Sequence, residues 1–286
     1  MPAIGHIRNP RATRSRPAEI GSDVLSCEPE SFGALEDALS EMAEAGVERL
    51  VIEGGDGTIR EVISRAPEIW ETPPAYAIIR SGNTNLVART AGDIPAPEAA
   101  AKARLTTTLP VLKVERLGEP PLRGFIMGVG AYERATRMAQ QEMASKHGLQ
   151  VVLAVLRAAR DPAFRDCGEI GLTLDGDETT HKRMLVGLST LPGKLIYGME
   201  PFWNGGNGPI RWLDIAASPP RLFSALPFVA FGRPRSWMAG AYRSGSSHVV
   251  EIHCKDGFVL EGERFASGPD GRIRVTAAET ATFLRV

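Results

Sequence analysis

In the first hundred residues, short apolar runs alternate with segments in which apolar residues recur at helical spacing. The run Ala3–Ile7 suits a short apolar strand, and the runs Leu50–Ile52 and Tyr76–Ile79 suit strands that are buried on both faces. Between the first two, Ser31–Ala45 reads as an amphipathic helix that Gly46 ends. Its apolar face would carry Phe32, Leu35, Leu39 and Met42. Alternating strands and helices predict a Rossmann-like α/β domain with a parallel sheet and right-handed crossovers.

Beyond Thr106 the pattern changes to short β-branched runs separated by Gly, Pro and Asp turns. Such dense short strands predict an antiparallel, β-sandwich-like domain. The predicted strands are 111–116, 125–129, 170–174, 184–188, 210–215, 249–253, 258–260 and 273–275. We expect an α/β domain over residues 1–109 and a β-rich domain over 110–280, with a last strand near 281–286 returning to the first domain.

Two stretches interrupt the β-rich half. Ser145–Phe164 is a helical candidate, best explained as a helix packed on the sandwich. Ser218–Met238 mixes large apolar side chains with three arginines, and its prolines argue against one continuous helix. Its composition suits either core packing or an interface between acyl chains and lipid headgroups.

A glycine-rich turn follows the second apolar run and reads Gly54-Gly55-Asp56-Gly57-Thr58. Helical spacing resumes after it, and Thr58 with Glu61 forms a capping-box pattern, so we expect the helix to begin at Thr58. A strand, a turn without side-chain bulk and a helix N-terminus form a geometry that binds phosphate. The turn is neither a Walker A loop nor a dinucleotide fingerprint.

Asp56 is the unusual residue of this turn. A lone carboxylate would repel phosphate, but a Mg²⁺ ion between the two would remove the conflict. The alternative is an ordinary strand–turn–helix connection in which Asp56 only tolerates an unusual backbone angle.

Composition excludes some classes of function but does not identify one. The chain has 286 residues and a formal net charge of −1, which gives no general attraction to nucleic acid. Its three cysteines and five histidines show no metal-ligand or disulfide spacing. The N-terminus lacks a signal pattern, and no apolar run approaches the ~20 residues that span a bilayer. We expect a cytoplasmic protein, at most peripheral on the inner membrane face.

The pentapeptide Gly54–Thr58 resembles the GGDGT signature of diacylglycerol, sphingosine and ceramide kinases, NAD kinases and phosphofructokinases. In diacylglycerol-kinase-like proteins the first strand ends in Asn-Pro and a Ser-Gly pair. Asn9 and Pro10 match, whereas Arg11-Ala12-Thr13 replaces the pair. The arginines here are either a solvated basic loop or a clamp on nucleotide phosphates. They are Arg11, Arg14 and Arg16.

Residues 82–86 resemble the family's second nucleotide loop, Gly-Thr-x-Asn-Asp. Gly82 and Asn85 match, Asn83 replaces the Thr, and Leu86 replaces the Asp. We expect Asn83 or Thr84 to cap the helix that follows. The resemblance implies that ATP is bound by Asn9, Gly54, Gly55, Asp56, Gly57, Thr58, Gly82, Asn83, Thr84 and Asn85.

The C-terminal part carries Glu261-Gly262-Glu263 where the family has Asp-Gly-Glu. In the family, an acid of this trio is thought to take the proton from the acceptor hydroxyl. The resemblance implies that Glu261 or Glu263 is this base, without choosing between them. The alternative is two solvated acids on a surface turn.

Together these resemblances imply an ATP-dependent lipid kinase that uses Mg²⁺ at Asp56. Its acceptor would be a hydroxyl of a diacylglycerol, a ceramide or a sphingoid base, met at a membrane surface. Relatives are often dimers, which makes a homodimer an expectation. One alternative is a NAD kinase, although the Asn-Glu pair usual in that family is absent. The other is an inactive relative that binds nucleotide or lipid, suggested by the changes at Arg11–Thr13, Asn83, Leu86 and Glu261.

Overall fold

The computed structural model describes residues 3–12, 24–82, 84–142, 160, 169–179, 181–195 and 198–285. The chain divides into two compact units. Unit 1 comprises Met1–Val111, Leu122–Gly124 and Glu279–Val286, and unit 2 comprises Leu112–Pro121 and Phe125–Ala278. The helical candidate 145–164 lies outside the described residues, apart from Arg160.

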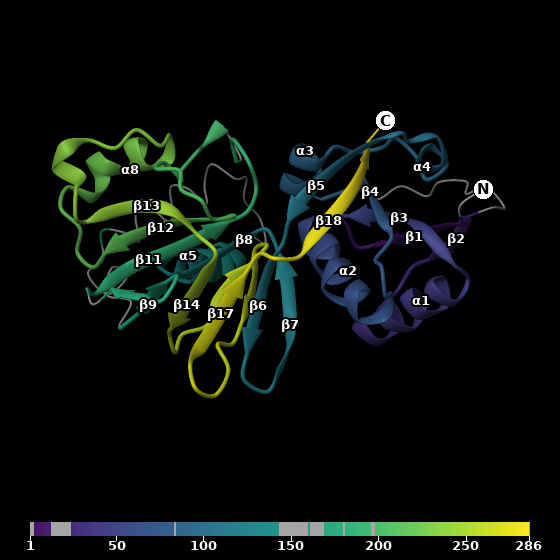
Figure 1. The fold of residues 1–286 in the computed structure, drawn as a ribbon, viewed down its shortest axis with the longest axis horizontal. Helices are drawn as coiled ribbons and strands as arrows, with labels where there is room; N and C mark the ends of the chain where they lie inside the picture. Colours follow the sequence, from purple (N-terminus) through teal and green to yellow (C-terminus); the bar gives the residue numbers. More distant parts are fainter. Residues whose placement is uncertain are drawn as a thin grey trace. The chain divides into compact units, whose positions relative to one another are not determined.

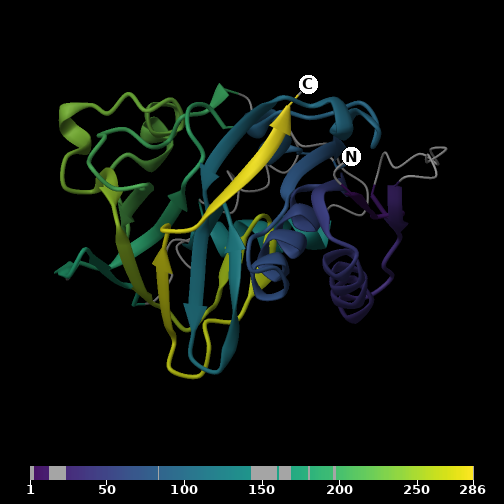
Figure 2. The ribbon, with the colours of Figure 1, turned by 45° about the vertical axis from the view of Figure 1, so that its right-hand side comes forward.

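Unit 1 is built on a six-stranded sheet with helices on both faces (Figure 1). In spatial order its strands are β2 (Val24–Cys27), β1 (Ala3–Arg8), β3 (Val47–Gly54), β4 (Ala75–Arg80), β18 (Thr280–Arg285) and β5 (Leu105–Pro110). All neighbours are parallel except β18 and β5. The C-terminal strand β18, in yellow, therefore completes the N-terminal sheet (Figure 2).

Helices α1 (Phe32–Glu44) and α2 (Asp56–Ile69) cover one face of this sheet, while α3 (Leu86–Ala91) and α4 (Ala99–Lys102) cover the other (Figure 1). Leu50, Val51 and Ile52 of β3 are fully buried because both faces are covered. On the α4 face, Val51 joins a core cluster with Ile4 and Ala100. The predicted Rossmann-like domain is confirmed, with one antiparallel strand added at its edge.

Helix α1 begins where the sequence predicts, since the Ser31 side chain accepts a hydrogen bond from the Ala34 amide. Its buried face includes Leu35, Leu39 and Met42. The prediction for Phe32 is wrong, because this side chain is 62% exposed. Phe32 opens the helix outside the core, and the Arg65 guanidinium lies 5.2 Å from its ring centre.

Unit 2 contains two six-stranded antiparallel sheets, as the second half of the sequence predicts. One sheet consists of β10 (Asp177–Thr179), β9 (Gly171–Leu174), β14 (Val249–His253), β17 (Arg272–Thr276), β6 (Leu112–Arg116) and β7 (Glu119–Gly124). The other consists of β13 (Tyr242–Ser247), β12 (Ile210–Ala216), β11 (Arg183–Ser189), β8 (Ile126–Gly130), β15 (Phe258–Leu260) and β16 (Glu263–Phe265). The fold class is therefore confirmed for both halves.

In the part of unit 2 that the structure describes, helical elements accompany these sheets. Helix α5 (Ala131–Glu142) follows β8 and packs on it through the Tyr132 ring, which lies over Gly128. Residues 218–238 form α8 (Leu222–Ala230) and the 3₁₀ turn η2 (Ser236–Met238), so this stretch is indeed not one helix. Within the described ranges, none of the helices reaches the length and apolarity needed to span a bilayer.

Candidate nucleotide site

Three loops of unit 1 meet at one edge of its sheet, where β1, β3 and β4 end. Because these neighbouring strands are parallel, their carboxyl ends lie side by side. Ligands of open α/β sheets bind at this edge. The structure thus brings together the loop at Asn9, the turn at Gly54–Gly55 and the turn from Gly82 to Asn85.

The first turn leads directly into α2, which begins at Asp56 and not at the predicted Thr58. Gly55 is the N-cap residue, and no side chain caps the helix. Glu61 does not complete a capping box, because its carboxylate pairs with Arg60 at 2.5 Å and also with Arg65. The first-turn N–H groups of a helix have no partner within the helix, so the N-terminus of α2 is open to a ligand.

Thr58 has a different role, in holding the Asn9 loop. Its Oγ1 accepts a hydrogen bond of 3.0 Å from Asn9 Nδ2. The backbone N–H of Asn9 donates to the carbonyl of Glu53, and the side-chain Oδ1 of Asn9 accepts from the backbone N–H of Arg11. Asn9 therefore fixes the loop after β1 against the first turn of α2, through bonds that only an amide side chain can make together.

The second turn is closed by its own asparagine. Asn85 Oδ1 accepts from the Gly82 amide at 3.0 Å, and Asn85 Nδ2 donates to the Gly82 carbonyl at 2.6 Å. Asn85 is the N-cap residue of α3 and has a left-handed backbone, with φ of 49°. The prediction that Asn83 or Thr84 caps this helix is wrong, since neither occupies the N-cap position. Asn83 itself lies outside the described residues.

Asp56 supplies the missing cap of α3 from a distance of thirty residues. Its Oδ2 accepts from the Leu86 amide at 3.0 Å, and its Oδ1 accepts from the Val87 amide at 3.1 Å. Burial raises the pKa of Asp56, while these two bonds and nearby Arg89 act in the opposite direction. The residue thus ties the second turn to the first. Sequence reasoning missed this role, because a contact between two motifs has no local signal.

The two glycine turns also touch through their backbones. A Cβ atom placed on Gly82 would lie 2.6 Å from Gly55 Cα, closer than real side chains approach. A Cβ on Gly54 would lie 2.5 Å from the Cβ of Thr58. Gly55 and Gly82 are therefore required by packing between the two turns, and Gly54 by packing against Thr58 at the start of α2.

A buried contact between a histidine and a glutamate supports the turns and was also missed. His6 is fully buried, and its Nε2 lies 3.3 Å from Glu53 Oε2, one residue before Gly54. Burial lowers the pKa of His6, although Glu53 opposes that shift. The signal in the sequence was an acid inside an apolar strand, which is costly unless a partner is buried with it.

In unit 2, Glu261 and Gly262 form a two-residue hairpin turn between β15 and β16. Both have positive φ, 51° and 81°, as a type I′ turn requires. Glu261 Oε1 accepts hydrogen bonds from the amides of Phe125 at 2.6 Å and Ile126 at 2.9 Å. This carboxylate holds the hairpin turn against the start of β8.

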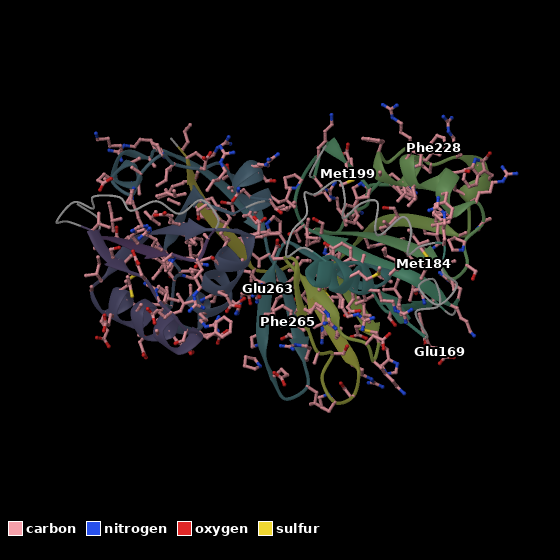
Figure 3. All side chains as sticks on the ribbon, turned by 180° about the vertical axis from the view of Figure 1, so that it is seen from behind. Glu169, Met184, Met199, Phe228, Glu263 and Phe265 are labelled. Atoms are coloured by element: carbon pink, nitrogen blue, oxygen red, sulfur yellow. The ribbon has the colours of Figure 1, made fainter. Side chains whose placement is uncertain are left out.

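Glu263 differs from Glu261 in its surroundings. It lies exposed on β16, two residues before Phe265 (Figure 3). The Glu261 carboxylate also affects Tyr132 of α5. Burial and this nearby negative charge raise the pKa of Tyr132 to about 12. The two acids that the sequence left undecided are thus a bound structural carboxylate and an exposed one.

The residues present fit a metal ion only if a ligand brings part of its shell. Among the described residues, no group of three or more His, Cys, Asp or Glu side chains could hold a metal. Asp56 offers one carboxylate, already bonded to two amides. Mg²⁺ commonly binds through one or two carboxylates together with phosphate oxygens and water. A metal-nucleotide complex suits this arrangement, whereas a metal held by protein side chains alone does not.

Comparisons with known proteins agree with the geometry. Residues 11–114 match the family profile of the diacylglycerol kinase catalytic domain. No protein of curated function matches the chain. A crystal structure of a protein assigned as a diacylglycerol kinase from Bacillus anthracis strain Sterne has a TM-score of 0.64 at 16% identity. A second crystal structure, of a diacylglycerol kinase from the same strain, has a TM-score of 0.62 at 15% identity.

Each of these comparisons covers 98% of this chain and 96% of the other. At such low identity the likeness establishes the fold of both halves. The family match adds the segment from Arg11 to Val114, which contains both glycine turns and Asp56. This segment, which is less than half of the chain, is therefore similar to the diacylglycerol kinase catalytic domain.

Proposed function

We propose that the protein is an ATP-dependent lipid kinase that transfers the γ-phosphate to a lipid hydroxyl. The observation that carries this proposal is the open N-terminus of α2, fourteen residues long and without a side-chain cap, beside two packed glycine turns. Such an N-terminus combines free N–H groups with the positive end of the helix dipole, and so favours a phosphate group.

The chain's own residues would bind and orient the nucleotide. The amides of Asp56, Gly57 and Thr58 would donate to phosphate oxygens, while Asn9 and Asn85 hold the flanking loops. A Mg²⁺ ion carried by the phosphates would lie beside Asp56 and neutralise charge on them. Phosphoryl transfer needs little covalent help from the protein, so positioning and charge stabilisation would supply most of the rate.

We assign the proton-accepting role to Glu263 and a positioning role to Glu261. A general base must reach the acceptor hydroxyl, and exposed Glu263 can present its carboxylate to a substrate. One Glu261 oxygen is already bound by two backbone amides and fixes the turn that carries Glu263.

An assay with γ-labelled ATP and Mg²⁺ over a panel of lipids tests the proposal. The panel contains a diacylglycerol, a ceramide and a sphingoid base, with NAD as a further acceptor. Label in a lipid product is expected. Label in NAD alone would instead show a NAD kinase, and calorimetric ATP binding with no transfer to any acceptor would show an inactive relative.

A lipid acceptor implies that the protein works at a membrane. We propose a cytoplasmic protein that meets its substrate at the inner membrane face, acts as a homodimer and binds no nucleic acid. Cell fractionation and light scattering of the purified protein test the location and the dimer. Recovery only as a monomer, or only with the soluble fraction at low salt, would contradict these statements.

A further inference from the structure

The nucleotide site leaves the surface around α8 without a role. Figure 1 shows α8 at the edge of unit 2 that carries β13. Leu222, Ala225 and Val229 form its buried face. Tyr242 of β13 anchors the start of the helix, since its hydroxyl donates to the Pro220 carbonyl at 2.8 Å. The helix is therefore held firmly against the unit along one side.

The other side of α8 is apolar and exposed. Phe223 is 43% exposed and Phe231 is 52% exposed, with exposed Pro227 between them. The spacing of four residues places these three side chains in one row, opposite the buried face. Exposing an apolar row to water is unfavourable in free energy, and such a row often marks a surface that another molecule or a membrane covers.

Arginines flank this row. The guanidinium of Arg235 lies 4.7 Å from the ring centre of Phe228, a side chain that Figure 3 shows on α8. The guanidinium of Arg221 lies 5.6 Å from the ring centre of Trp237. Arg233 is exposed between them in the chain. These contacts hold two guanidinium groups on aromatic side chains next to the apolar row. A third arginine reaches the row itself, since the guanidinium of Arg160 lies 5.4 Å from the ring centre of Phe223.

The charge of this part of the chain is strongly one-sided. Residues 215–250 contain four arginines and no Asp or Glu, but Arg243 pairs with Asp214 of β12 at 3.6 Å, which leaves Arg221, Arg233 and Arg235 as the positive charges of this region. The whole chain has a formal net charge of −1, so removing these three positive charges leaves −4 for the rest. The apolar row thus lies in the cationic region of a chain that is otherwise acidic.

We propose that the α8 surface, formed by Arg221, Phe223, Phe231, Arg233 and Arg235, docks on an anionic phospholipid bilayer. A bilayer is anionic at its phosphates and apolar just below them, which matches arginines beside exposed phenylalanines. Arginine also fits phosphate groups well, because its planar guanidinium donates two hydrogen bonds at once. The inference rests on the proposed function, since it identifies the surface that meets the lipid acceptor's membrane.

Co-sedimentation with vesicles tests the docking surface. The full-length protein is expected to bind phosphatidylcholine vesicles that contain phosphatidylglycerol, and to bind pure phosphatidylcholine vesicles far less. Replacing Arg221, Arg233 and Arg235 by Gln should weaken binding about fivefold for each charge, hence on the order of a hundredfold for all three. Phe223→Ser with Phe231→Ser should weaken it at least about tenfold.

Matched variants control for charge and exposed apolar area. Arg104, Arg272 and Arg274 are exposed arginines elsewhere, and their triple replacement by Gln removes the same charge. Leu105 and Leu117 are 64% and 62% exposed, and their replacement by Ser removes exposed apolar area. Both controls should keep most of the vesicle binding. Equal losses in the controls, or no binding of the unaltered protein to anionic vesicles, would overturn the proposal.

Two further measurements separate the alternatives. If Phe223→Ser with Phe231→Ser converts a dimer to a monomer in light scattering, a second copy covers the row and the bilayer proposal is wrong. Activity on a short-chain, water-dispersed diacylglycerol should survive in the α8 variants while activity on vesicles falls. Vesicle binding without any kinase activity would refute the proposed function and leave the docking surface standing.

Discussion

Replacing Asp56 by Ala tests whether this residue is a structural cap or only a ligand of the metal-nucleotide complex. The substitution removes both acceptors for the amides of Leu86 and Val87, at 3.0 and 3.1 Å. Loss of a helix cap typically costs about 0.5–2 kcal/mol. Because two buried amides lose their acceptor here, we expect a loss of about 1–3 kcal/mol in the free energy of unfolding of unit 1.

The raised pKa of Asp56 makes the outcome discriminating. Burial penalises the ionised form of this carboxylate, while its two hydrogen bonds and nearby Arg89 favour that form. If Asp56 served only a bound metal, removing it would relieve that cost, and the free protein would be unchanged or more stable. If it caps α3, Asp56→Ala is destabilising and Asp56→Asn, which keeps one acceptor oxygen, is intermediate.

Thermal denaturation followed by circular dichroism, in the absence of nucleotide, measures the difference. For a unit of roughly this size, each kcal/mol lowers Tm by about 3–5 °C. Asp93→Ala is a matched control, because Asp93 pairs with Arg80 at 2.6 Å on the surface, where ion pairs contribute about 0–1 kcal/mol. Equal Tm values for the Asp56→Ala variant and the unaltered protein would refute the capping role.

Three other predictions follow from the same geometry. Gly82→Ala should weaken ATP binding at least about tenfold in calorimetry, because the added Cβ would lie 2.6 Å from Gly55 Cα in the neighbouring turn. Gly33→Ala is the control: an added Cβ there meets no atom within 4 Å, so the variant should be more stable by about 0.5–1 kcal/mol. Glu263→Gln should lower kcat on lipid with little change in Tm, whereas Glu261→Gln should lower Tm as well; the reverse pattern would exchange their roles. Tyr132 ionises at about pH 12 when folded and near pH 10 when unfolded, so stability should fall as pH rises above 10. Tyr132→Phe should remove on the order of 2–3 kcal/mol of that fall in urea unfolding, and an unchanged pH profile would contradict the assignment.

The apolar pattern was enough to predict the two halves of the fold. The run Leu50–Ile52 is apolar without alternation, and only a strand covered on both faces suits such a run. The glycine turn was placed correctly for a similar reason, because it interrupts the pattern between a strand and a helix. Phe32 was placed wrongly because helical spacing identifies a face but not where the core beneath that face ends.

The details of the site depend on contacts that no local pattern encodes. The capping-box rule compares Thr58 with Glu61, but Thr58 bonds to Asn9, forty-nine residues earlier in the chain. The cap of α3 comes from Asp56, thirty residues away. For both Thr58 and Asp56 the local sequence suggests one role, but the observed hydrogen bonds are made with residues far away in the chain. Only the fold decides between them, since it brings the carboxyl ends of parallel strands together.

The central claim is that the open N-terminus of α2 and the two glycine turns hold the phosphates of ATP. Amide chemical shifts of ¹⁵N-labelled protein, titrated with ATP and Mg²⁺ and separately with adenosine, test it most directly. Large shifts at Asp56, Gly57, Thr58 and Gly82 with ATP, but not with adenosine, are the predicted result. Saturable ATP binding that leaves these four amides unshifted would contradict the account.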